Sequence, residues 1–456
     1  MRVLEVIHGF PPRYNAGSEL YTQTISEGLL VRGHNVSVFC RQENPFEEEY
    51  GLTTEEENGV KLYIVNHFTS KDKFRTDQIE KRFEQVLDIE KPDIVHIGHL
   101  SHLSTGLPEI SKRHHVPVIF TLHDYWLACP RGQFLQVMPN STGNWPCCPG
   151  QEDKRCAERC YSRTHAGSVD MKNSDMAYWT SWIHSRMSDV RKQLSSIDML
   201  VSPSMYLRDR IIKELGVPTR KIVVEHYGFD HHRLNGRIRN PETSMVFGYI
   251  GRIIAAKGIN DLINAFGMLK GNPRLRIWGE NTFPDGVALK KLAASISQRN
   301  RGRIEWCGPY RNTDIVESVL NRVDVVVVPS IWDENSPLVI QEALHARVPV
   351  IAPNHGGMGE LVRDGENGLT YPHRDMLGLY RKMQYAVESQ NAMTALGSRG
   401  NLYSIDGKAH PISNHVMFLE GLFRLVLHGN VSSRGVTGSE IGRSVNSSES
   451  SAIGGS

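Results

Sequence analysis

The chain alternates short apolar runs with helical stretches, and it does so in two separate sets along its 456 residues. The first set includes "RVLEVIH", "PDIVHIG" and "VPVIFTLHD"; the second begins at "SMVFGYIGR" and continues through "VDVVVVPS". Strands that alternate with helices form parallel sheets, because right-handed crossovers return the chain to the same edge. The pattern therefore predicts an α/β fold with two Rossmann-like, doubly wound domains.

The polar stretch 233–244, "RLNGRIRNPETS", separates the two sets and is typical of a linker. We therefore expect an N-terminal domain over 1–235 and a C-terminal domain over 245–410, with a further helix over 411–430 that crosses back to the first domain. Residues 431–456 are rich in Ser and Gly and poor in large apolar side chains. Such a segment buries too little to order itself, which predicts a disordered tail.

The overall charge and hydropathy exclude two classes of partner. A net charge of +2, with basic residues that form no long stripe, gives no reason to expect nucleic acid. No apolar run reaches the length of a membrane span, and the N-terminus enters a strand at once, so we expect a cytoplasmic protein. A helix near 182–195, with Trp182 and Arg191, is compatible with peripheral contact at the inner membrane face or with ordinary packing.

Three loops of the second set have features that suit an anionic ligand. In "GYIGRIIAAKG", Arg252 and Lys257 follow a strand, and two cations there suit an anion with several oxygens. Two solvated side chains on a loop are the ordinary alternative. In "NHGGMGE", Gly356 and Gly357 lie at a strand-to-helix turn where bare backbone can approach a ligand.

The third loop, "PSIWDENSPLVIQEA", ends in a helix. Ser336 and Pro337 fit the N-cap and first helical position, which leaves the amides of Leu338 and Val339 for a phosphate group. Glu334 and Glu342 flank this predicted phosphate-binding position. Carboxylates near a phosphate are tolerated where they face hydroxyl groups of the ligand. We therefore expect Glu334 to hold a sugar and Glu342 a ribose, and the ligand to be a nucleotide-diphosphate sugar.

These motifs together resemble the retaining glycosyltransferases of family 4, which have the GT-B fold of two domains that face each other across a cleft. The matching features are the two glutamates with seven residues between them, the "GRxxxxKG" element, the N-terminal loop "PPRYNAGSE" and the stretch "GGMGELVRDGENGL". The resemblance runs from residue 1 to about 372, and more weakly to about 428. It implies transfer of a sugar from a nucleotide-diphosphate sugar to a glycan or lipid-linked acceptor, in the synthesis of cell-surface polysaccharide or glycoconjugate.

The resemblance also implies roles for single residues. Arg252 and Lys257 would neutralise the diphosphate leaving group, and Glu334 would contact the donor sugar. Gly17 would let the first loop close on the phosphates. His123, in "TLHD", matches a family histidine near the donor sugar, although a histidine at a strand end is often only a core residue.

The same resemblance bears on mechanism. Two cations and a helix end do the electrostatic work of a metal, so no catalytic metal is expected. No carboxylate is an obvious nucleophile, which favours front-side attack through an oxocarbenium-like state, with the departing phosphate taking the proton of the acceptor. Two alternatives remain open from the sequence: a GT-B sugar-nucleotide epimerase, and a non-catalytic protein that binds nucleotide sugars.

Five cysteines crowd into a stretch, 129–160, that departs from the common family pattern: Cys129, Cys147, Cys148, Cys156 and Cys160. In a cytoplasmic chain such crowding indicates a metal rather than disulfides. We expect at least four of them to bind one structural zinc ion or iron–sulfur cluster, with plain reduced thiols as the alternative. The histidines of "HIGHLSH", His96, His99 and His102, are expected in a loop that lines the acceptor site.

Overall fold

The computed structural model describes residues 1–69, 73–136, 145–161, 173–228, 230, 232–239, 242–280, 285–296, 298–301, 303–399 and 411–429. These residues cluster into two compact units. Unit 1 contains Met1–Gly132, Ala177–Gly228 and the segment from Pro411, and unit 2 contains Gln133–Met176 and Phe229–His410, as far as they are described. The tail expected over 431–456 lies outside the described residues.

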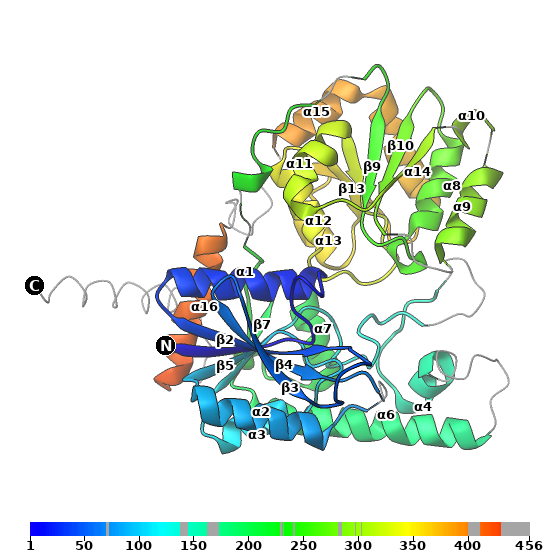
Figure 1. The fold of residues 1–456 in the computed structure, drawn as a ribbon. Coiled ribbons are helices and arrows are strands. Elements are labelled where there is room, and N and C mark those ends of the chain that lie inside the picture. The colour runs from blue at the N-terminus through cyan, green and yellow to red at the C-terminus, as the bar shows by residue number, and fades with distance from the viewer. Residues whose placement is uncertain are drawn as a thin grey trace, which may run out of the picture. The chain divides into compact units, whose positions relative to one another are not determined.

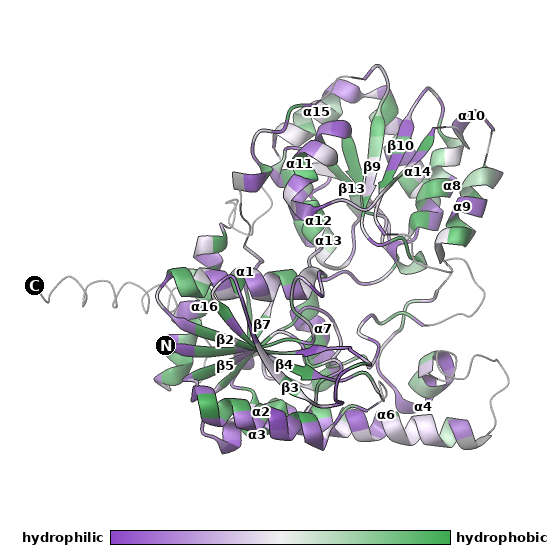
Figure 2. Ribbon diagram, viewed as in Figure 1, coloured by the Kyte–Doolittle hydropathy of each residue, from purple (hydrophilic) through white to green (hydrophobic). Residues whose placement is uncertain are grey.

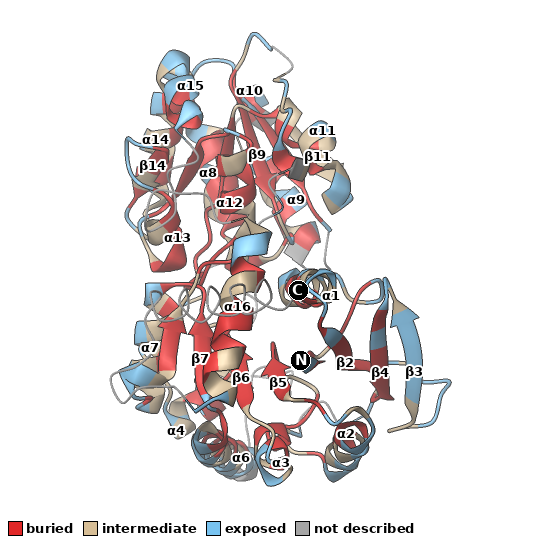
Figure 3. Cartoon of the chain, turned by 90° about the vertical axis from the view of Figure 1, so that its left-hand side faces the viewer, coloured by how far each residue is buried: buried red, intermediate tan, exposed pale blue. Residues whose placement is uncertain are grey.

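Unit 1 is built on a sheet of eight strands in the order β3-β4-β2-β1-β5-β6-β7-β8. All neighbours pair in parallel except β3 and β4. The strands are β1 (Arg2–Val6), β2 (Asn35–Gln42), β3 (Leu52–Glu57), β4 (Val60–Asn66), β5 (Ile94–Ile97), β6 (Val118–Thr121), β7 (Met199–Ser202) and β8 (Ile222–Val224). The edge strand β3 is largely exposed, whereas the central strands are buried (Figure 3).

Helices cover both faces of this sheet, with α1 and α16 on one face and α2 and α3 on the other (Figure 1). The helices of unit 1 are α1 (Gly17–Val31), α2 (Asp77–Glu90), α3 (Leu107–Arg113), α6 (Asn173–Gln193), α7 (Met205–Leu215) and α16 (Ile412–Leu427). Tyr21, Ile25 and Leu29 recur at helical spacing on α1 and are buried, as their periodicity predicts.

Helix α16 packs against α1, although almost 400 residues separate them in sequence. The Arg32 Nε and the Glu420 Oε2 are 2.5 Å apart, and Arg424 on the same helix bonds the other oxygen of Glu420 at 2.7 Å. The described C-terminal helix is therefore an integral part of unit 1.

Unit 2 has a parallel sheet of six strands in the order β11-β10-β9-β12-β13-β14. The strands are β9 (Val246–Ile250), β10 (Arg274–Trp278), β11 (Ile304–Gly308), β12 (Val325–Val327), β13 (Val350–Pro353) and β14 (Gly368–Tyr371). Its helices are α4 (Asp153–Cys156), α8 (Ile259–Met268), α9 (Asp285–Ser295), α10 (Gln298–Arg301), α11 (Ile315–Ser318), α12 (Leu338–His345), α13 (Gly356–Leu361), α14 (Met376–Glu388) and α15 (Gln390–Ser398).

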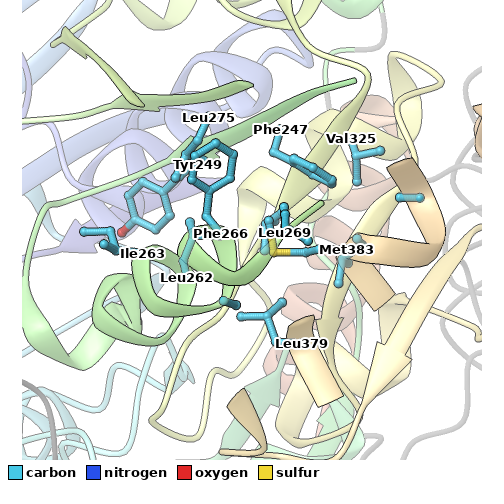
Figure 4. Packing of buried hydrophobic residues seen from close by; sticks show 14 of the residues in the cluster. Phe247, Tyr249, Leu262, Ile263, Phe266, Leu269, Leu275, Val325, Leu379 and Met383 are labelled. Carbon is cyan, nitrogen blue, oxygen red and sulfur yellow. The ribbon is translucent and has the colours of Figure 1, made fainter. Parts of the chain in front are cut away.

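Short 3₁₀ helices and one π-helical turn complete the description: η1 (Ala157–Tyr161, π), η2 (Leu194–Ser196), η3 (Thr219–Lys221), η4 (His232–Leu234), η5 (Ala255–Lys257), η6 (Asn312–Asp314) and η7 (Leu320–Arg322). The core of unit 2 lies between its sheet and helices α8 and α14. There Phe247, Leu262, Phe266 and Met383 pack together (Figure 4). Hydrophobic residues gather in the strands and on the inner helix faces, and hydrophilic residues on the outer faces (Figure 2).

The structure confirms the α/β class and the two sheets with parallel strands predicted from the sequence. The cysteine-rich insertion was expected in the N-terminal domain. The structure instead assigns Gln133–Met176 to unit 2, as far as these residues are described. The reason is local packing, because the Arg374 guanidinium of unit 2 donates to the Trp145 carbonyl and the Cys147 thiol lies 3.7 Å from the Ile331 carbonyl oxygen.

The helix near 182–195, compatible from its sequence with membrane contact or with ordinary packing, makes packing contacts within unit 1. On α6, Trp182 meets Phe74 edge-on with ring centroids 5.6 Å apart, and Val190 is buried. Arg186 is buried as well, and its Nη2 donates to the Trp126 carbonyl at 2.6 Å. The described residues include no helix with the length and apolar character that crossing a bilayer requires.

Candidate functional site

The order of strands in unit 2 identifies the edge at which a ligand would bind. Strand β9 lies at the centre, with β10 and β11 on one side and β12, β13 and β14 on the other. In such sheets the crevice at the carboxyl ends of the two strands where the order reverses is the usual ligand site. The loops after β9 and β12 flank this crevice, and they carry Lys257 and Glu334 respectively.

The structure brings these two residues into direct contact. The Lys257 Nζ lies 2.6 Å from the Glu334 Oε1, and the Ser330 hydroxyl donates to the same oxygen at 2.6 Å. Glu334 is buried, whereas the Lys257 side chain is partly exposed and lies 5.2 Å from the centroid of the Trp332 ring. A buried carboxylate is thus compensated by one cation and one hydroxyl, and the cation keeps access to solvent.

Arg252, the second predicted cation, is exposed on the same loop. Its backbone carbonyl accepts a hydrogen bond from the Tyr249 hydroxyl at 2.7 Å, which fixes the main chain. The two cations are therefore held in place differently. The side chain of Lys257 contacts a buried carboxylate, whereas Arg252 is positioned through its backbone.

Glu342 also has a cationic partner, one that the sequence analysis missed. The Arg233 Nη2 lies 2.8 Å from the Glu342 Oε1, and the Asn312 side-chain amide is 3.4 Å from the same oxygen. Arg233 is the first residue of the stretch interpreted as a plain linker, and the structure places it in the short helix η4. Arg233 pairs with Glu342 because the fold brings together two residues that are far apart in the sequence. No local sequence motif indicates this contact.

The start of α12 corrects one prediction. Pro337 is the N-cap, with φ −67° and ψ 117°, and the helix begins at Leu338. Ser336 does not cap the helix, because its hydroxyl accepts a hydrogen bond from the Gln341 side chain at 2.9 Å. Leu338 and Val339 are nevertheless the first two helical residues, whose amides lack intrahelical acceptors.

Gly356 and Gly357 have a packing role in the structure, and their predicted approach to a ligand stays a prediction. They begin α13, and the Gly357 amide donates to the Glu334 carbonyl at 2.7 Å. A Cβ on Gly357 would lie 1.5 Å from the Asn335 carbonyl oxygen, and Gly356 has φ +58°. The glycines thus let the α13 loop pack directly on the backbone of the loop that carries Glu334.

A stacked pair of histidines, His355 and His373, supports the loop that carries Glu334. The His355 Nε2 lies 2.8 Å from the Asp333 Oδ1, and the His355 ring stacks on His373 with centroids 4.1 Å apart. Desolvation and the neighbouring His355 lower the pKa of His373 to about 4, so the outer ring of the stack is neutral near pH 7. The pair packs against Asp333, in the loop that carries Glu334.

The cysteines do not form the expected ligand set. Within the described parts of the chain, which include all five, no three His, Cys, Asp or Glu side chains come close enough to hold a metal ion. Leu135 and Cys147 form an isolated antiparallel bridge, and neighbouring residues in such extended backbone point to opposite sides. The Cys147 thiol accordingly lies near the Ile331 carbonyl and the Cys148 thiol near the Gly150 carbonyl, 3.1 Å away. The described residues therefore do not confirm the predicted metal centre, which stays a prediction.

In unit 1, His123 follows β6, and Gly17 is the first residue of α1. The His123 Nδ1 lies 2.7 Å from the Tyr227 hydroxyl. Desolvation lowers the pKa of His123 to about 3, and His99 contributes in the same direction. His123 is therefore a neutral imidazole near pH 7.

Of the histidines expected in a loop, His96 is placed differently, whereas His99 lies in the loop that follows β5. His96 lies on β5 rather than in a loop, and it is buried with its Nδ1 2.8 Å from the Glu5 carboxylate. His99 lies 3.4 Å from Asp124 and packs on His8, with ring centroids 4.6 Å apart. Glu19 bonds His8 at 3.2 Å, and these contacts with His8 and Ser18 outweigh desolvation and lower the pKa of Glu19 to about 2.

Because the folded-state pKa of His123 is below its ordinary value of 6.5, the unfolded chain binds a proton more readily at this site. The contribution of neutral His123 to stability is therefore complete above pH 6.5 and is lost as the pH falls from 6.5 toward 3. We expect His123→Gln to lose less unfolding free energy than the wild type between pH 7 and pH 5. Urea unfolding at both pH values measures the difference, and identical losses would contradict the assigned shift.

Two family models together cover residues 16–402 of the chain. Residues 16–233 match Glycosyltransferase Family 4, and residues 232–402 match Glycosyl transferases group 1. This chain belongs to the family 4 glycosyltransferases. The boundary between the two matches falls at the stretch that carries Arg233, so each half of this glycosyltransferase matches its own model.

Full-length relatives agree with this assignment. The glycosyltransferase is 26% identical over 405 residues to a glycogen synthase of Mycobacterium tuberculosis, covering 86% of this chain and 87% of the relative. It is 24% identical to an uncharacterized 42.6 kDa protein in the cps region of Klebsiella pneumoniae, covering 80% of this chain and 88% of that protein.

Solved structures show that the fold of this glycosyltransferase is GT-B. Sucrose-phosphate synthase from Thermosynechococcus elongatus aligns with a TM-score of 0.67 at 15% identity, covering 94% of this chain and 99% of the other. HepE of Anabaena, solved in complex with UDP and glucose, aligns with a TM-score of 0.64 at 16% identity, covering 93% and 100%.

Proposed function

We propose that this glycosyltransferase transfers a sugar from a nucleotide-diphosphate sugar, with retention of configuration, to a glycan or lipid-linked acceptor in cell-surface polysaccharide synthesis. The observation that carries the donor assignment is the pair Lys257–Glu334 beside the first turn of α12. A cation, free helical amides and a buried carboxylate then lie on the same crevice edge of one sheet. The cation and the helical amides can bind a diphosphate, and the carboxylate can accept a hydrogen bond from a sugar hydroxyl.

Glu342 supports the nucleotide end of this assignment. Arg233 and Asn312 both bond its Oε1, which orients the carboxylate on α12. A carboxylate fixed in this way accepts well from the paired hydroxyl groups of a ribose. In the proposed complex, Glu342 binds the ribose, Lys257 and Arg252 bind the diphosphate, and Glu334 contacts the sugar.

The reaction needs charge stabilisation more than a nucleophile. As the bond between sugar and diphosphate breaks, negative charge grows on the leaving phosphate, and preorganised cations stabilise that charge. Lys257 begins in contact with Glu334 and has to exchange part of this contact for the phosphate. The phosphate then accepts the proton of the acceptor hydroxyl, which attacks from the same face.

The type of acceptor is proposed by analogy. One similar protein is a putative colanic acid biosynthesis glycosyltransferase of Salmonella typhimurium, and another is encoded in the cps region of Klebsiella pneumoniae. A thermal-shift screen against UDP-, GDP-, ADP- and dTDP-sugars would identify the donor, because a bound ligand stabilises the folded state.

The two glutamates should respond differently to neutralisation. We expect Glu342→Gln to weaken binding of both the free nucleoside diphosphate and the sugar donor by about 10-fold, as for loss of one charge-assisted hydrogen bond. Glu334→Gln should lower turnover while leaving the affinity for the free nucleotide within about 3-fold, because its partner is the sugar. Calorimetric titration and initial rates provide the two measurements. Equal, small effects of both substitutions would rule out the assignment.

A further inference from the structure

His123 sits in a cage of aromatic side chains drawn from distant parts of unit 1. Its ring lies edge-on to Tyr21, with centroids 4.7 Å apart, and stacks on Tyr227 at 5.7 Å. Tyr21 and Tyr227 are themselves 5.1 Å apart and both are buried. The imidazole is thus packed by two tyrosines, only one of which hydrogen-bonds to it.

Tyr21 is locked in place by the C-terminal helix. Its hydroxyl lies 2.8 Å from the Nε2 of His415 on α16, and His415 is buried. Tyr21 therefore fixes the plane of the His123 ring by packing, while its polar end is engaged elsewhere. Of the two tyrosines, Tyr227 is the one whose hydroxyl lies at hydrogen-bond distance from the His123 ring.

The direction of the hydrogen bond between Tyr227 and His123 follows from the two groups. A neutral imidazole carries one proton, and it sits on whichever nitrogen does not accept a hydrogen bond. A phenol is a stronger donor than an imidazole N–H, and an unprotonated imidazole nitrogen is a stronger acceptor than a phenol oxygen. The Tyr227 O–H therefore donates to Nδ1 across the 2.7 Å contact, and the proton of His123 resides on Nε2.

We infer that Tyr227 is a positioning residue that holds His123 in the Nε2–H form, so that the histidine meets a sugar hydroxyl as a hydrogen-bond donor and not as a base. Nε2 is buried beside Gly98, at the carboxyl end of β5, where a Cβ would lie 3.5 Å from it. The low pKa of His123 agrees with this role, because a neutral ring at working pH needs a partner to select its tautomer. The inference rests on the proposed function, in which His123 lies near the donor sugar.

The test is Tyr227→Phe, which keeps the ring and removes the hydroxyl, alone and combined with His123→Ala. We expect Tyr227→Phe to lower kcat about 10-fold with little change in donor KM, as for one lost orienting hydrogen bond. In the His123→Ala background the same substitution should change kcat less than about 2-fold, because the residue acts only through His123. Tyr63→Phe, which removes a hydroxyl bonded to Glu90 elsewhere in unit 1, is the matched control and should keep wild-type kinetics.

A spectroscopic measurement separates tautomer from packing. In protein labelled with ¹⁵N at histidine, the wild-type His123 ring should show a protonated Nε2 and an unprotonated Nδ1. Tyr227→Phe should shift both resonances toward a mixture of the two tautomers. If His123→Ala keeps full activity, the proposed role of His123 fails. If His123→Ala is impaired but Tyr227→Phe keeps wild-type kcat and tautomer, the inference about Tyr227 is wrong.

Discussion

Replacing Lys257 with alanine should lower turnover by a factor of about 10² or more, because it removes a cation from the site where charge develops on the leaving phosphate. The structure adds a second effect that the sequence does not reveal. Lys257 is the cationic partner of the buried Glu334, so its loss leaves that carboxylate with only the Ser330 hydroxyl. We therefore expect the folded state to be destabilised by about 1–3 kcal/mol, since a buried charge loses its partner.

Two further variants separate the charge effect from the stability effect. Arg252→Ala should lower turnover similarly but leave unfolding unchanged, because Arg252 is exposed and its backbone makes the structural contact. Lys257→Ala combined with Glu334→Gln should regain stability, because the buried charge is removed, but should not regain turnover. Rates and urea unfolding are measured on the same preparations. A folded Lys257→Ala protein with full activity would refute the role in leaving-group stabilisation.

Gly357→Ala should be among the most disruptive single methyl additions in the chain. The added Cβ would lie 1.5 Å from the Asn335 carbonyl oxygen and 2.4 Å from its carbon, so backbone has to move. The moving segment is the loop that carries Glu334, which is bonded to the Gly357 amide. We expect a loss of more than about 3 kcal/mol in unfolding free energy, and loss of nucleotide binding in whatever remains folded.

Gly359→Ala is the matched control on the same helix. Its Cβ would meet the Asn354 side-chain oxygen at 2.7 Å, and the nearest backbone atom would be 3.3 Å away. A side chain can rotate away, so stability should fall by less than about 1 kcal/mol. Thermal unfolding in the presence and absence of a nucleoside diphosphate measures both quantities. Equal behaviour of the two variants would show that the contact between the α13 and β12 loops does not order the site.

Much of the fold was predictable because strand and helix periods differ and both recur in this chain. The central strands β9 and β12 are continuous apolar runs, and β1 and β5 are largely apolar, as expected of strands that are covered on both faces. Strand β3 was missed because its sequence, "LTTEEE", is almost wholly polar. It lies at the sheet edge and pairs antiparallel with β4, where burial does not constrain its side chains.

The parts of the candidate site that lie in local motifs were predictable from the sequence. Contacts between residues far apart in the sequence were not. The order of the loops indicated two segments, after β9 and β12, that the structure brings into contact through Lys257 and Glu334. Arg233 and Tyr227 were missed, because each acts on a residue about 100 positions away through one hydrogen bond. The metal centre was predicted from composition, which counts cysteines but does not report the direction of their side chains. Ser336 had the residue type of an N-cap, but its hydroxyl bonds Gln341 instead.

The division of the chain into units has a practical consequence for building hybrid enzymes. The polypeptide passes from one unit to the other at 132–133, 176–177, 228–229 and 410–411. A hybrid joined once, in the linker, would combine a foreign α16 with the native α1 and lose the matched pair Arg32–Glu420. It would also place the native Trp145 and Cys147 against a foreign surface in place of Ile331 and Arg374, beside the loop that carries Glu334. Recombination with a relative should therefore exchange whole units at all four junctions, so that every segment keeps its native packing partners.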